Sequence, residues 1–120
     1  MTSDVTSLKI GVLGCGNVGA ALVELVEVQR AAVLARTGID LTVTRVAVRN
    51  MSAPRDVELA EGVLTRDAMG VVVDPDVDII VESIGGIEPA RELILAALAH
   101  GKPVVTANKE LLANVGAELY

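Results

Sequence analysis

Short runs of apolar residues alternate along this chain with longer stretches in which apolar residues return at helical spacing. Four of the runs are short, rich in Val, Ile and Leu, and end at glycine or polar residues, as buried strands do. They cover residues 8–13, 41–48, 78–82 and 103–106. Val63 and Leu64 are a candidate for a further, very brief strand.

The stretch between the first two runs predicts a long helix from Asn17 to about Arg36. Its apolar stripe consists of Val18, Leu22, Leu25 and Val26. The stripe is expected to face the core. Gly38 supplies the stop, because glycine readily adopts the left-handed conformation that follows many helices.

The second half of the chain predicts three more helices. A short one is expected to be capped by Thr65, to run through Val72 and to end before Asp74-Pro75, since the residue preceding proline avoids helical geometry. A longer one covers 88–100, with proline in its first turn. A last helix starts near Asn108. Residues 49–56 are polar, contain a proline and are expected to form a loop.

Strands that alternate with helices imply parallel strands joined by right-handed crossovers. We therefore expect an α/β doubly wound parallel sheet with helices on both faces. Residues 1–7 are expected to be a flexible tail and residues 8–120 to form one domain.

The amino-acid composition and the net charge argue against several classes of function. The chain has 120 residues, of which 52% are hydrophobic, with one Tyr and neither Phe nor Trp. A single-stranded nucleic-acid platform needs aromatic side chains, and the net charge of −6 disfavours a phosphate-backbone partner. The single cysteine allows no internal disulfide and fits a reducing cytosol. No signal peptide or membrane-length apolar run is visible, so we expect a cytoplasmic protein that binds neither nucleic acid nor membrane.

Three glycines fall in the register G-x-G-x-x-G where the first strand ends and the long helix begins. Gly14 permits the tight turn, Gly16 lets a pyrophosphate approach the backbone, and Gly19 lets the helix pack closely on the strand. The amide groups of the first helical turn can then hold phosphates. The pattern predicts a Rossmann-type dinucleotide site, and the alternative is a tight turn without a ligand. Cys15 is interpreted as a small residue that fills a permitted position, and no metal site is expected.

The end of the second strand indicates which dinucleotide binds. NAD sites place Asp or Glu there to bind the ribose 2′-hydroxyl, but this chain has Arg49, followed by Asn50 and Arg55. No acidic residue occurs between Leu41 and Arg55. Because arginine suits a phosphate, these residues favour NADP(H), with NAD(H) as the other possibility. The alternative is a solvated basic loop.

The stretches "GVLGCGNVG", "VAVRNMSAPRD" and "DIIVESIGGIEPARELILAALAHGKPVVTANKELLA" closely resemble homoserine dehydrogenases, from about Leu8 to Tyr120. The resemblance implies an enzyme that interconverts L-homoserine and L-aspartate 4-semialdehyde with NAD(P), in the synthesis of threonine, methionine and isoleucine. It implies that the cofactor contacts Asn17 and Val18 at the phosphate turn and passes Ser83 and Gly85 beside the nicotinamide.

The same resemblance implies that Lys109 of "TANK" reaches the cofactor, although a surface lysine is the alternative. Glu82 is either a polar strand terminus or a contact to the cofactor ring. The family's substrate-binding and dimerising domain and its catalytic residues follow this segment. We therefore expect a fragment or truncated form with no catalytic residue of its own, taken from a homodimeric enzyme. The competing functions are a non-catalytic dinucleotide-sensing module and a related aspartate or semialdehyde dehydrogenase.

Overall fold

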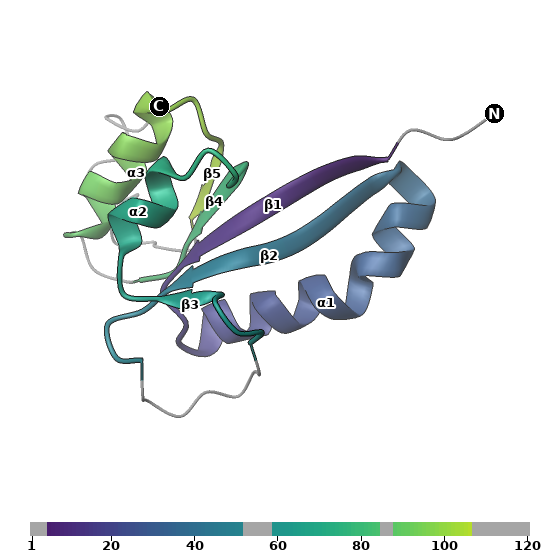
Figure 1. Ribbon diagram of the computed structural model, residues 1–120, viewed down its shortest axis with the longest axis horizontal. Helices are drawn as coiled ribbons and strands as arrows, with labels where there is room; N and C mark the ends of the chain where they lie inside the picture. The colour runs from purple at the N-terminus through teal and green to yellow at the C-terminus, as the bar shows by residue number, and fades with distance from the viewer. Residues whose placement is uncertain (1–4, 52–58, 85–87, 107–120) are drawn as a thin grey trace.

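The computed structural model describes residues 5–51, 59–84 and 88–106. They form a parallel sheet of five strands in the order β3-β2-β1-β4-β5 (Figure 1). The strands are β1 (Thr6–Leu13), β2 (Ile39–Ala47), β3 (Leu64–Thr65), β4 (Ile79–Glu82) and β5 (Val104–Thr106). The helices are α1 (Asn17–Thr37), α2 (Ala68–Val73) and α3 (Ala90–Ala99). The expected α/β doubly wound architecture is confirmed.

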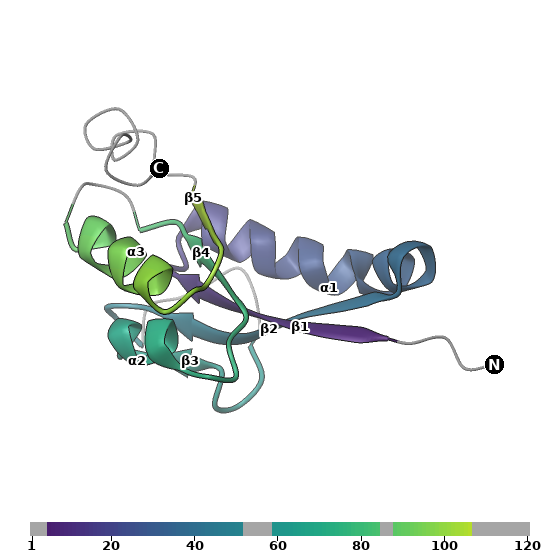
Figure 2. The same ribbon diagram turned by 90° about the horizontal axis from the view of Figure 1, so that it is seen from above.

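The order of the strands reverses direction beside β1. The chain passes from β1 outward to β2 and β3, then returns across the sheet so that β4 pairs with the other side of β1. Right-handed crossovers place α1 on one face and α2 and α3 on the other (Figure 2). The chain therefore leaves β1 and β4 toward opposite faces of the sheet, which makes their paired carboxyl ends a topological switch point, the place where open α/β sheets bind ligands.

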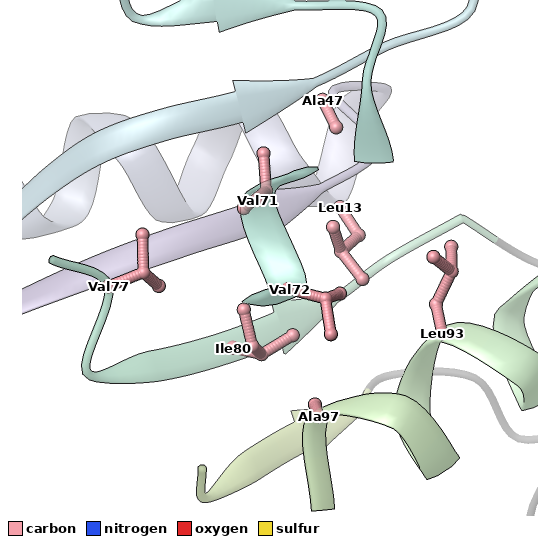
Figure 3. Packing of buried hydrophobic residues seen from close by; sticks show 8 residues of the cluster. All are labelled: Leu13, Ala47, Val71, Val72, Val77, Ile80, Leu93 and Ala97. Carbon is pink, nitrogen blue, oxygen red and sulfur yellow. The ribbon is translucent and has the colours of Figure 1, made fainter. Parts of the chain in front are cut away.

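Each face of the sheet has its own apolar cluster, because successive side chains of a strand point to opposite faces. Figure 3 shows the larger cluster, in which side chains of α2 and α3 cover one face. Its buried members are Leu13, Ala47, Val71, Val72, Val77, Ile80, Leu93 and Ala97. The cluster beneath α1 contains the buried residues Ile10, Val12, Val23 and Val46.

The orientation of α1 differs from the expected stripe. Val18 and Leu25 are 59% and 56% exposed, whereas Leu22 and Val26 pack against the sheet beside the buried Val23. Close approach to the sheet explains the difference, since the buried positions at the start of the helix are the small residues Gly19 and Ala20. The helix contacts the sheet through the face that carries these small residues, and the larger Val18 and Leu25 remain exposed to solvent.

Several boundaries also differ from the expected ones. β1 begins at Thr6, so Thr6 and Ser7 belong to the sheet and not to a flexible tail; the Thr6 amide donates to the Gly38 carbonyl oxygen at 2.9 Å. Asp67, rather than Thr65, caps α2: its carboxylate accepts from the Gly70 amide at 2.9 Å. Thr65 belongs to β3. The expected helix after Asn108 lies outside the described residues.

Gly11, which precedes the glycine motif, has a packing role. A Cβ atom on Gly11 would lie 2.6 Å from a methyl carbon of Val71 and 2.9 Å from one of Val77. Only hydrogen at this position lets α2 and the chain leading into β4 rest directly on β1. This contact helps to fix α2 beside the carboxyl ends of the strands.

Candidate functional site

The turn from β1 into α1 is built by the first glycine of the motif. Gly14 has a φ angle of +92°, a left-handed conformation that side chains disfavour. Its amide donates to the carbonyl oxygen of Ala47 at 2.8 Å, which ties the turn to the end of β2. A side chain at Gly14 would also press on the backbone of Ser83 and Ile84. The turn is therefore fixed between β2 and β4.

The second glycine borders open space. Gly16 is the N-cap of α1, and a Cβ atom built on it would have no atom within 4 Å. No side chain caps this helix, and its first turn contains no acidic residue. Amide groups at a helix N-terminus attract anions, and here no carboxylate of the first turn competes for them. The geometry thus leaves room for a phosphate where the sequence predicts one.

The third glycine contacts protein. A Cβ atom on Gly19 would overlap the Gly14 carbonyl oxygen and lie 3.0 Å from the Ser83 hydroxyl oxygen. That hydroxyl lies 3.0 Å from the carbonyl oxygen of Gly14 and 3.2 Å from that of Leu13, and it donates to this pair. Gly19 and Ser83 therefore support the phosphate turn from behind. Because both residues press on the backbone of this turn, the turn offers a dinucleotide a rigid surface.

The turn opens into a crevice with a volume of about 770 Å³. Residues at or just beyond the carboxyl ends of β1, β2, β3 and β4 line it, together with parts of α2 and α3. The lining residues are Gly14, Cys15, Gly16, Ala47, Val48, Arg49, Asn50, Arg66, Ala68, Ser83, Ile84, Pro89 and Leu93. None of these lining residues is acidic, although the chain as a whole has a net charge of −6.

Two arginines line the crevice on its β2–β3 side. Arg49 follows β2, as expected, and its side chain is exposed. Arg66 follows β3 and was missed by the sequence analysis. The signal that could have found it is its place immediately after Leu64–Thr65, because carboxyl ends of parallel strands share one edge of the sheet. Two guanidinium groups can hold a phosphate at the adenosine end of a dinucleotide.

The structure gathers part of the expected set of residues. Gly14, Gly16, Arg49 and Ser83 line the crevice. Asn17 and Val18 are exposed at the start of α1 but are not among the lining residues. Gly19 lies behind the turn. Arg55, Gly85 and Lys109 lie outside the described residues.

Glu82 ends β4 as a completely buried carboxylate. Its two oxygens accept hydrogen bonds from the Ile84 amide and the Thr106 hydroxyl, each at 2.6 Å. Of the two readings of Glu82, the structure favours the strand terminus, since the side chain has no exposed surface.

Within 5–51, 59–84 and 88–106, no three His, Cys, Asp or Glu residues are grouped so that they could hold a metal ion. In the same part of the chain, no helix combines the length and the apolar character that crossing a bilayer requires. Cys15 is a half-buried free thiol beside the turn.

A parallel sheet, a glycine turn at its switch point and an uncapped helix facing a crevice define a dinucleotide-binding domain of the Rossmann type. Comparison with known proteins identifies the family to which this domain belongs. Residues 14–120 match the family model described as homoserine dehydrogenase, NAD binding domain. The chain belongs to the homoserine dehydrogenase family, and the described residues from 14 onward lie in its domain for a nicotinamide dinucleotide.

Individual relatives agree with this assignment. A homoserine dehydrogenase from Synechocystis sp. is 46% identical over 114 residues, which are 95% of this chain and 26% of that protein. The corresponding protein of Bacillus subtilis is 37% identical over 94% of this chain and 26% of its own length. The chain thus spans about a quarter of the curated relatives that it matches.

Solved structures of the family have the same fold. The crystal structure of Staphylococcus aureus homoserine dehydrogenase at pH 8.5 superposes with a TM-score of 0.89 and 36% identity, over 96% of this chain and 29% of that one. The structure from Thiobacillus denitrificans gives 0.86 and 42%, over 98% of this chain and 27% of that one.

Proposed function

We propose that this chain is the NADP(H)-binding part of an enzyme that interconverts L-homoserine and L-aspartate 4-semialdehyde. Family membership supports the reaction. The observation that supports NADP(H) is the crevice itself, which among the described residues is lined by Arg49 and Arg66 and by no carboxylate. A site for NAD normally provides a carboxylate for the ribose 2′-hydroxyl, whereas a 2′-phosphate needs cationic donors.

Four residues of the crevice then have a definite role in binding the cofactor. Gly16 leaves room for the pyrophosphate, which the first-turn amides of α1 would hold. Arg49 and Arg66 bind the 2′-phosphate, and Asn50 adds a polar side chain beside them. The described residues would contribute binding and orientation, and a bound NADP+ would accept the hydride from the alcohol carbon of homoserine.

Three residues of this proposal lie outside the described part of the chain. Arg55 is proposed as a further contact to the 2′-phosphate, Gly85 as a neighbour of the nicotinamide, and Lys109 as a contact to the cofactor at the edge of the active site. Asn17 and Val18 are proposed to contact the cofactor through the backbone of the first turn. The catalytic groups are proposed to come from the part of the enzyme that corresponds to the remaining three quarters of its relatives.

The wider biological role is proposed on the same basis. The enzyme would act in the cytoplasm, as a homodimer, in the synthesis of threonine, methionine and isoleucine. A single cysteine and the absence of membrane-length apolar runs in the sequence support that location.

The direct test is an assay of the full-length protein with L-homoserine and either NADP+ or NAD+. The expected result is homoserine-dependent reduction of the cofactor, with kcat/KM at least tenfold higher for NADP+. Reduction with aspartate or a different aldehyde-alcohol pair, but not with homoserine, would indicate a related dehydrogenase. Tight dinucleotide binding without any turnover of homoserine would indicate a sensing module.

A further inference from the structure

Glu82 is the one charged residue that is fully buried among the described residues. It lies in the sheet, opposite Leu13 of β1 on one side and opposite Thr106 of β5 on the other. No ion pair of Glu82 with a cationic side chain occurs in the part of the chain that the structure describes. Burying a carboxylate is costly, so an apolar residue would suit this position better if it served packing alone.

The hydrogen bonds of Glu82 indicate what compensates for the burial. One carboxylate oxygen accepts from the Ile84 backbone amide and the other from the Thr106 hydroxyl, both at 2.6 Å. Hydrogen bonds to an ionised acceptor are short and strong. Glu82 therefore ties the backbone just beyond β4 to the last residue of β5. The two residues that it joins, Ile84 and Thr106, are 22 positions apart in the sequence.

Of these two segments, the one beyond β4 lines the crevice through Ile84, on the other side of β1 from the arginines, and β5 lies next to β4 in the sheet. Arg49 and Arg66 follow β2 and β3, the phosphate turn follows β1, and Ile84 lines the crevice beyond β4. A dinucleotide bound across the switch point places its two mononucleotide halves on the two sides of β1. With the adenosine half beside the arginines, the nicotinamide half would lie just beyond β4, beside Ile84.

We infer that Glu82 is a positioning residue for the nicotinamide half of the cofactor: it holds the Ile84 backbone and Thr106 in one fixed relation and does not contact the cofactor. The inference rests on the proposed dinucleotide function and assigns a role that neither the glycine motif nor the arginines fill. A rigid wall lowers the entropic cost of ordering the nicotinamide, so that loosening it weakens binding of this half alone.

The test compares two ligands in the full-length protein. NADPH occupies both halves of the crevice, whereas adenosine 2′,5′-bisphosphate has no nicotinamide and reports the adenosine half. Glu82→Gln keeps the shape of the side chain and removes its charge; the amide oxygen can still accept from the Ile84 amide, but the NH₂ group cannot accept from the Thr106 hydroxyl. Thr106→Val keeps the shape of threonine and removes the hydroxyl, and Thr106→Ser is the matched control that retains it.

We expect Glu82→Gln and Thr106→Val to weaken NADPH binding about tenfold, the size typical of one lost hydrogen bond to a charged group. Affinity for adenosine 2′,5′-bisphosphate should stay within about twofold of wild type, and Thr106→Ser should restore NADPH binding. In the homoserine assay, KM for NADP+ should rise in the two weakened variants and return to the wild-type value in Thr106→Ser.

Two results would overturn the inference while leaving the proposed function intact. One is unchanged NADPH affinity in both Glu82→Gln and Thr106→Val. The other is an equal loss for both ligands together with a lower melting temperature, which would make Glu82 a general structural residue. Failure of the wild-type protein to bind either ligand would instead reject the dinucleotide function itself.

Discussion

Gly19 in the first turn of α1 packs directly against the carbonyl oxygen of Gly14, so that a Cβ atom on Gly19 would overlap this oxygen. Both partners belong to the backbone of the phosphate turn, and neither can rotate away. Gly14 is further held by the Ser83 hydroxyl on the same side. The contact predicts that the glycines of one motif respond differently to the same added methyl group.

Gly19→Ala should lower the free energy of unfolding by about 1–3 kcal/mol, the usual cost of overpacking a tight contact. Alanine is intrinsically about 1 kcal/mol better than glycine in a helix, so a net loss would come from the clash with Gly14. Urea unfolding followed by circular dichroism measures the change in the free energy of unfolding. Stability equal to or above wild type would show that the turn can move aside.

Gly16→Val should behave in the opposite way. Gly16 has φ and ψ angles of −82° and −154°, an extended conformation that any residue adopts, and its Cβ position faces open space. We expect the melting temperature to stay close to wild type and NADPH binding to fall below detection, because the side chain occupies the place of the pyrophosphate. Calorimetric titration checks this. Retained affinity would mean that the motif serves the fold and not a ligand.

Arg49→Asp should reverse the preference between the cofactors. A hydrogen bond between charged groups contributes about 1.5–3 kcal/mol, so wild type should bind NADPH roughly ten- to a hundredfold more tightly than NADH. The variant repels the 2′-phosphate and offers an acceptor to the 2′-hydroxyl of NADH. Titration with both cofactors at two salt concentrations measures the change.

Arg45 provides the matched control for this substitution. It lies on β2, the strand that Arg49 follows, but its guanidinium donates to the Gly62 carbonyl oxygen at 3.1 Å and pairs with Asp74 at 3.7 Å, away from the crevice. Arg45→Ala should leave the ratio of the two affinities unchanged. Equal binding of NADPH and NADH by wild type, or an equal effect of the two substitutions, would contradict the role assigned to Arg49.

The ion pair between Arg30 and Asp40 predicts a pH dependence of stability. The Arg30 guanidinium meets the Asp40 carboxylate through two contacts of 2.6 and 3.0 Å and links α1 to β2. The hydrogen bond from Arg30 holds the pKa of Asp40 below its ordinary value of 3.8. A lowered pKa means that the unfolded chain binds the proton first, so stabilisation is complete above pH 3.8 and is lost as pH falls through the lower folded-state value.

Asp40→Asn should therefore be less stable than wild type at pH 7, and the difference should shrink below pH 3.8. Urea unfolding of both proteins between pH 7 and pH 3 measures this difference. In an Arg30→Met background, the same substitution should show no such pH dependence. A constant difference across this range would indicate that the pair is not formed in solution.

A polypeptide of residues 1–120 should bind NADPH without oxidising homoserine. It contains the phosphate turn and the arginines, but it spans only about a quarter of its homoserine dehydrogenase relatives. Fluorescence titration and a cofactor-reduction assay test the two halves of this statement, with the full-length protein as the control. Homoserine-dependent reduction by the short polypeptide would refute it.

The sequence by itself determined the features that are encoded locally. Apolar runs and helical spacing give the strands and helices because each reflects the period of its own backbone. The strand-turn-helix register predicts the tight turn at Gly14 and the start of the helix at Gly16, since a turn and an N-cap depend on a few adjacent residues. The place of Arg49 followed in the same way from its position just beyond a predicted strand.

Only the tertiary structure decided which distant residues meet and which way each element turns. Arg66 joins Arg49 because parallel strands bring their carboxyl ends to one edge, whatever their separation along the chain. The rotation of α1, which leaves Val18 and Leu25 exposed, depends on how closely Gly19 approaches the turn. From the sequence, Glu82 is either a polar strand terminus or a contact to the cofactor ring. Its partner becomes visible only when β5 lies beside β4 and places the Thr106 hydroxyl against its carboxylate, because a hydrogen bond between strands exists only once they are paired.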